Sequence, residues 1–143
     1  MPSNILVPAA TLVVWTLVML LWMVATRGPA LSKLGADKLK RGARGTDVEA
    51  MLDDRVNWKA HNYVHLHEQP TVFYAAVLIL VLAGYGTADV LLAWAYVVLR
   101  VLHSIWQAAV NRQPGRVVLF LASSLFLVAL GVRALLATLA IQV

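Results

Sequence analysis

One stretch of the sequence decides the fold: residues 5–26 read ILVPAATLVVWTLVMLLWMVAT and contain no charged side chain. A helix of this length covers the roughly 30 Å of hydrocarbon in a bilayer. No Lys or Arg precedes the run, and the run is longer than the apolar segment of a cleavable signal peptide. We therefore expect a retained membrane-spanning helix.

Three further apolar stretches follow, at about residues 55–83, 88–110 and 116–139, and short turns at 84–87 and 111–115 separate them. The stretches are long and continuous without strict alternation, which favours helices over a membrane β-barrel. The 143 residues are 61% hydrophobic and 13% charged, and a soluble domain of this size could not bury so much apolar surface. The sequence predicts an all-α, integral membrane four-helix bundle that forms a single domain over residues 1–143.

Charge is concentrated in the first connection, residues 27–54, and at the start of the second span. Eight of the twelve basic residues lie between Arg27 and Lys59, with five of the seven acids, one of them Asp37. The net charge of +5 is best explained by membrane topology and lipid headgroups, so we expect no nucleic-acid partner. The positive-inside rule predicts a cytoplasmic first connection and both termini outside, and we expect a short surface helix from Asp47 onward. The compact, cysteine-free, Ala/Leu/Val-rich chain suggests a bacterial inner membrane.

Ionisable and polar side chains occur inside the spans, where they are costly and usually face a bundle interior or a cavity. Those on the second span are spaced i, i+4, i+7, those on the third i, i+3, i+7, and the fourth span begins with an arginine followed one turn later by an aromatic residue. In order they are His61, His65 and Glu68; Arg100, His103 and Gln107; and Arg116 and Phe120. Residues at these spacings share a helical face.

The direction of each span brings these three sets to one depth, in the cytoplasmic half of the bundle. This convergence predicts a polar cavity, rich in cationic groups, that suits a small anionic ligand. Lipid-facing grooves beside the cavity could admit an apolar ligand. The chain has no cysteine, so a thiol that reacts here must come from a substrate.

The sequence resembles the MAPEG family, the membrane-associated proteins in eicosanoid and glutathione metabolism. One motif is Arg100-x-x-His103 with Arg116 after a Pro-containing turn; another is Lys59-Ala60-His61-Asn62 followed by Glu68-Gln69-Pro70. The third feature is the plan of four spans with a long basic first connection containing Asp47-Val48-Glu49. The pattern is most similar to microsomal prostaglandin E synthase and microsomal glutathione transferase.

The resemblance implies a homotrimer that binds glutathione between neighbouring subunits and joins it to an apolar electrophile or reduces a lipid hydroperoxide. It implies that Arg116 stabilises the glutathione thiolate and that Glu68 holds the amino end of the tripeptide. The other expected glutathione contacts are His65, His61, Arg100, His103 and Gln107. No metal site is expected.

Several positions depart from the family pattern. With Glu68 as the anchor, His65 and His61 stand where the family has Asn and Arg, and Pro70 comes early. Anchoring on Asn62 instead would put Leu66 where Glu belongs. Gln107 and Phe120 stand where Tyr is usual. These departures leave open a non-catalytic, lipid-binding or scaffold protein, and also a proton- or ion-conducting bundle that uses the histidines. Arg116 and Glu68 have structural alternatives, as a topology-setting charge and as the partner of Arg100 or Arg116.

Overall fold

The computed structural model describes residues 4–35 and 38–141, so the predicted loop acid Asp37 lies outside the described residues. Within those ranges the chain is helical apart from its turns and connections. The helices are α1 (Leu6–Leu34), α2 (Gly45–Glu49), α3 (Asp54–His65), α4 (Gln69–Ala83), α5 (Thr87–Ala109) and α6 (Gln113–Ile141). Counting α3 and α4 together, the described residues contain four helical segments that are long and apolar enough to cross a membrane. The protein is an all-α, multi-pass integral membrane protein.

The first helix is longer than its apolar run. It passes Thr26 and Arg27 and ends at Leu34, with Pro29 inside it and Lys33 in its last turn. The sequence-based boundary at Thr26 marks where the charges begin, but backbone hydrogen bonds do not depend on that boundary and continue beyond it. A short helix is also present near the expected position, but α2 begins at Gly45 instead of Asp47 and already ends at Glu49.

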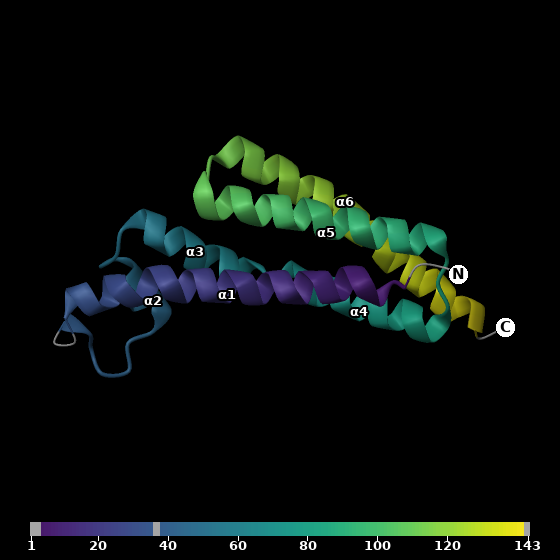
Figure 1. Ribbon diagram of the computed structural model, residues 1–143. Helices are drawn as coiled ribbons and strands as arrows, with labels where there is room; N and C mark the ends of the chain where they lie inside the picture. Colours follow the sequence, from purple (N-terminus) through teal and green to yellow (C-terminus); the bar gives the residue numbers. More distant parts are fainter. Residues whose placement is uncertain (1–3, 36–37, 142–143) are drawn as a thin grey trace.

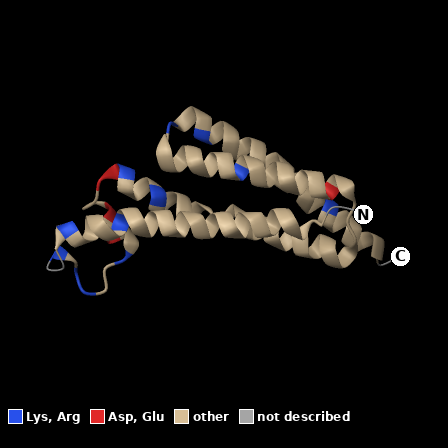
Figure 2. Ribbon diagram, viewed as in Figure 1, with Lys and Arg blue, Asp and Glu red and all other residues tan. Residues whose placement is uncertain are grey.

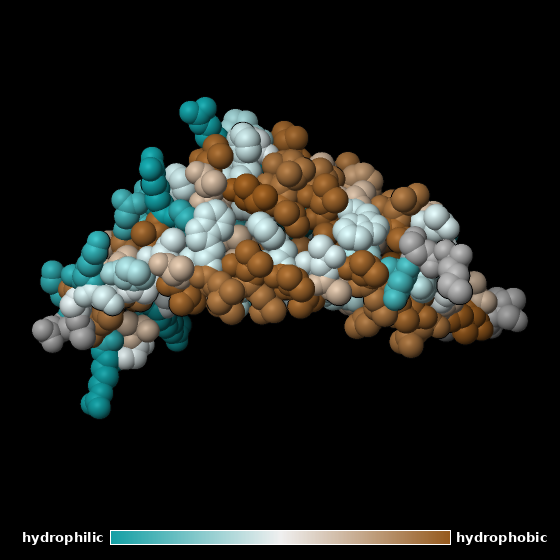
Figure 3. All heavy atoms as spheres, viewed as in Figure 1, coloured by the Kyte–Doolittle hydropathy of each residue, from teal (hydrophilic) through white to brown (hydrophobic). Residues whose placement is uncertain are grey.

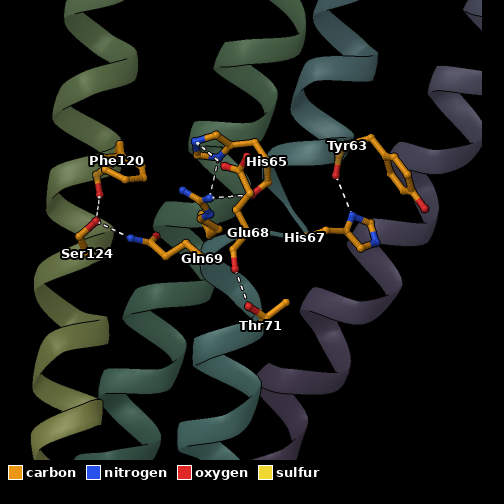
Figure 4. Close-up of polar contacts among 9 residues, drawn as sticks. Tyr63, His65, His67, Glu68, Gln69, Thr71, Phe120 and Ser124 are labelled. Carbon is orange, nitrogen blue, oxygen red and sulfur yellow. Dashed lines mark hydrogen bonds and ion pairs between the residues drawn. The ribbon is translucent and has the colours of Figure 1, made fainter. Parts of the chain in front are cut away.

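The second span is interrupted, a feature that the sequence analysis did not predict. Helix α3 ends at His65, and α4 begins at Gln69 with Pro70 in its first turn. Proline has no N–H group and fits the first turn of a helix, whereas inside a helix it removes a backbone hydrogen bond and favours a kink or a break. The Thr71 hydroxyl donates to the Glu68 carbonyl at 2.6 Å, as the close-up shows (Figure 4), and the Thr71 N–H donates to the same oxygen at 3.3 Å. The break therefore lies beside Pro70.

Helices α5 and α6 form a hairpin, and α4 packs against α6 while α1 packs against α3 and α5 (Figure 1). The core between them contains large buried side chains, among them Leu12, Phe73, Tyr96 and Leu130. The outer surface is also apolar: Leu82 is 86% exposed and Leu125 is 72% exposed. Figure 3 shows this apolar surface over the middle of the molecule, with hydrophilic residues concentrated at one end. So much exposed hydrocarbon requires lipid around it.

The two ends of the bundle differ in charge. Figure 2 shows most Lys and Arg residues at the end that carries the first connection, which is the end predicted to face the cytoplasm. Near the termini, at the other end, Arg133 Nε and Nη2 donate to the Asp89 carboxylate at 2.8 and 3.2 Å. Asp89 is fully buried and also accepts the Gly86 N–H. This pair, which the sequence did not reveal, ties α5 to α6.

Candidate functional site

A cavity of about 220 Å³ lies where three helices meet. His65 at the end of α3, His103 on α5, and Arg116, Val117 and Phe120 on α6 line it. The sequence analysis predicted that side chains from three separate spans would converge, and these side chains do so.

Stacked aromatic rings form one wall of the cavity. The rings of His65 and His103 are 5.2 Å apart between centroids and inclined by 27°, so they stack. Phe120 meets both, with centroid distances of 5.6 Å to His65 and 6.1 Å to His103. Figure 4 shows His65 and Phe120 on neighbouring helices. The packing fixes the orientation of the imidazoles.

Arg100 lies behind this wall and is fully buried. Its Nη2 donates to the His65 carbonyl at 3.1 Å and contacts His65 Nδ1 at 2.6 Å, and its guanidinium carbon lies 5.6 Å from the Phe120 ring. The carbonyl belongs to the last residue of α3, where the helix dipole places partial negative charge. Because the helix breaks between α3 and α4, this carbonyl is available to Arg100. Its partial negative charge stabilises the buried guanidinium, to which no carboxylate of the described residues is bonded.

The contact with Arg100 also fixes the proton on His65. Arginine has donors only, so His65 Nδ1 must be the acceptor, and a neutral His65 then carries its proton on Nε2. Glu68 Oε2 is 3.9 Å from that nitrogen. Among the described residues, Arg100 Nε and Nη1 have no hydrogen-bond partner, although both are buried. Unsatisfied buried donors are uncommon and favour an acceptor that binds nearby.

Arg116 is oriented by a residue that the sequence analysis missed. Its Nη1 donates to Asn111 Oδ1 at 3.0 Å. Asn111 has a φ of 52°, in the left-handed region that Asn adopts more readily than most residues. The signal in the sequence was the position of Asn111 at the start of the turn before α6. Asn111 both shapes this turn and holds the guanidinium.

Four of the predicted glutathione contacts do not line this cavity: Arg100, which lies behind its wall, and Glu68, His61 and Gln107. The Glu68 side chain is 62% exposed, and in the described part of the chain no ion pair joins it to Arg100 or Arg116. His61 forms an ion pair with Glu49, with 3.2 Å between Nε2 and Oε2. Gln107 is buried, and its Oε1 has no partner within the described ranges.

Asn62, the alternative anchor of the second-helix motif, has a structural partner. It is buried, and its Nδ2 donates to Ser104 Oγ at 2.6 Å. Trp15 Nε1 donates to the same oxygen at 2.9 Å. One hydroxyl therefore connects α1, α3 and α5 next to His103.

The site holds cations and aromatic surface, a combination that suits an anion with an apolar neighbour. An apolar groove of about 410 Å³ runs between α4 and α6, with Ala76, Ile79, Gly131 and Leu135 among its lining residues. For the residues that the structure describes, no group of three His, Asp or Glu side chains is placed to hold a metal ion.

Comparison with known proteins agrees with this architecture. The chain matches the MAPEG family over residues 5–136, nearly its whole length. No curated protein matches it significantly, and neither does any solved structure. From the extent of the family match, the chain belongs to the MAPEG family.

Proposed function

We propose that the protein is a membrane-bound, glutathione-dependent transferase or peroxidase that acts on an apolar electrophile. The observation that carries the proposal is Arg116, which lines a cavity beside His65 and His103 in a chain of the MAPEG family. Members of the family are typically glutathione-dependent enzymes. The pattern of Arg100, His103 and Arg116 favours the synthase and glutathione transferase branches.

Arg116 would act on the thiol of glutathione. A guanidinium stays charged at any working pH, so it favours the thiolate and lowers the pKa of a thiol beside it. Bound glutathione supplies the nucleophile: its sulfur bonds to the electrophilic carbon, and the electron pair leaves with the leaving group. The thiol proton passes to solvent. In hydroperoxide reduction the oxygen–oxygen bond breaks, and two glutathione molecules are oxidised to the disulfide as alcohol and water form.

Other residues of the chain would bind and orient the tripeptide. His65 suits a carboxylate, since its Nε2 carries a proton when this ring is neutral, and the buried Arg100 behind it would add positive charge to this side of the cavity. Glu68 is exposed near His65 and would hold the amino group. His61 and Gln107 would contribute from neighbouring turns. The open cavity and the exposed Glu68 are consistent with a homotrimer in which a second subunit completes the site. The bacterial inner membrane is the proposed location.

The test is turnover of glutathione with an apolar aryl chloride by the purified protein in detergent. We expect Arg116→Gln to lower the rate about 100-fold, the usual effect of losing a group that stabilises a developing anion. The rate of the variant should also increase with pH, because without Arg116 the pKa of the glutathione thiol should lie close to that of a free thiol, near 8.5. Arg112→Gln is the matched control, since Arg112 lies in the connection just before α6, is exposed and does not line the cavity. Equal rates in the two variants would remove Arg116 from the mechanism.

One observation favours a non-catalytic lipid-binding or scaffold protein instead. Phe120 lines the cavity without a hydroxyl, and Gln107 does not reach it. A protein of that class would convert no glutathione, and Phe120→Tyr would not give it activity. In an enzyme, the added hydroxyl of Phe120→Tyr supplies one more donor beside Arg116 and should raise the rate.

A further inference from the structure

The first connection folds back onto the bundle, and three of the contacts that hold it there lie in the described residues. Arg27 Nη2 donates to the Gly45 carbonyl at 2.7 Å, and Asn57 Nδ2 donates to the Glu49 carbonyl at 2.8 Å. The His61–Glu49 ion pair, at 3.2 Å, is the third. Helix α2 is therefore fixed against α1 and α3.

These contacts set the depth of the segment. Arg27 is the first charged residue after the apolar run, so it marks the edge of the hydrocarbon. Helix α1 continues roughly 10 Å beyond it to Leu34, and the chain then returns to the level of Arg27 at Gly45. The described residues between these points lie in the layer that phospholipid headgroups occupy.

A pocket of about 380 Å³ opens in this layer. Two lysines, Lys38 and Lys40, line it together with the apolar side chains of Leu39, Val48 and Met51. Val48 is 9% exposed and forms a fixed floor, whereas Met51 is 46% exposed. One acid, Asp47, also lines the pocket, but its Oδ2 accepts the Arg44 N–H at 2.8 Å. The pocket therefore combines two ammonium groups with an apolar surface.

We propose that this pocket, which we call the headgroup pocket, binds an anionic phospholipid. Lys38 and Lys40 would pair with the phosphate and the headgroup, because an ammonium near an anionic membrane surface gains affinity for it. Leu39, Val48 and Met51 would pack on the glycerol and the first methylenes. The apolar lining favours a lipid over free phosphate. The proposal does not depend on glutathione.

Native mass spectrometry of the detergent-purified protein tests this directly. The protein is titrated with phosphatidylglycerol, phosphatidylcholine or inorganic phosphate. We expect phosphatidylglycerol to bind in preference to the other two. The double variant Lys38→Gln/Lys40→Gln should bind it about 30-fold more weakly, because each ammonium contributes roughly fivefold. The variant Lys38→Arg/Lys40→Arg should keep the affinity.

The control is Lys33→Gln/Arg41→Gln, which removes the same charge from the same connection but outside the pocket. It should retain binding close to that of the wild type. Equal losses in the two double variants would show a diffuse surface effect and overturn the pocket. Binding of inorganic phosphate as tight as that of the lipid would show a phosphate site instead. If the lysine variant does not fold, Met51→Glu, which adds a carboxylate to the pocket wall, should reduce phosphatidylglycerol binding; unchanged binding would also overturn the proposal.

Discussion

The orientation of Arg116 depends on one side chain in the preceding turn. Asn111 Oδ1 accepts a hydrogen bond from its guanidinium at 3.0 Å, from a backbone with a φ of 52°. We expect Asn111→Gly to keep this turn, because glycine adopts positive φ freely, while removing the acceptor. Turnover should fall about tenfold, as expected for a hydrogen bond to a charged group, with little change in unfolding temperature. Steady-state rates and thermal unfolding in detergent measure both, and an unchanged rate would show that Asn111 does not position Arg116.

At the same scale, the sequence predicted some site residues and missed others for a physical reason. His103 lies one turn beyond Arg100 on an unbroken helix, so helical periodicity places both on one face. Asn111 was missed because its role depends on a single backbone dihedral in a turn, which periodicity does not describe. Its contact with Arg116 could be found only from coordinates.

At the scale of the elements, the break between α3 and α4 limits what helical spacing can predict. His61, His65 and Glu68 share a face only if the helix continues through all three, but α3 ends at His65. Glu68 has φ and ψ of −86° and −91°, outside the helical region, so helical spacing does not fix the position of its side chain, which lies 3.9 Å from His65 Nε2. Pro70 indicates this break in the sequence, but the prediction of one continuous span over residues 55–83 did not take it into account.

The hairpin of α5 and α6 depends on close contact between Gly115 and Trp106. A Cβ at Gly115 would lie 2.7 Å from two carbons of the Trp106 ring, and that ring is held by the Nε1 bond to the Arg112 carbonyl at 3.0 Å. We expect Gly115→Ala to destabilise the protein by about 1–3 kcal/mol, as overpacking usually does. Gly131→Ala is the control, since nothing lies within 4 Å of a Cβ there. Thermal unfolding in detergent should separate the two variants; equal unfolding temperatures would contradict the contact.

At the scale of the whole molecule, the membrane topology can be tested by labelling introduced cysteines, because the chain has no cysteine of its own that would react. Single cysteines would be introduced at Arg44 and Arg112, in the two basic connections, and at Thr87, at the opposite end. With a membrane-impermeant maleimide, Thr87→Cys should react in intact cells, whereas Arg44→Cys and Arg112→Cys should react only after lysis. The reverse pattern would invert the orientation that the basic connections predict.

The fold class was predictable at this scale because lipid restricts the choices. Each apolar run must satisfy its backbone internally, so long uncharged stretches become helices, and the structure has them. Outside the hydrocarbon, water can satisfy backbone hydrogen bonds, so hydropathy does not determine where these helices end. Helix α1 reaches Leu34, and the pair of buried Asp89 and exposed Arg133 joins α5 to α6 from positions that a hydropathy profile shows only as isolated charges.

Calorimetric titration of the detergent-solubilised protein with glutathione tests the central claim most directly, since it asks whether the cavity of His65, His103 and Arg116 binds the tripeptide at all. We predict measurable heat with the wild type and with Arg112→Gln, and a much weaker signal with Arg116→Gln. The absence of heat from the wild type at millimolar glutathione would contradict the account.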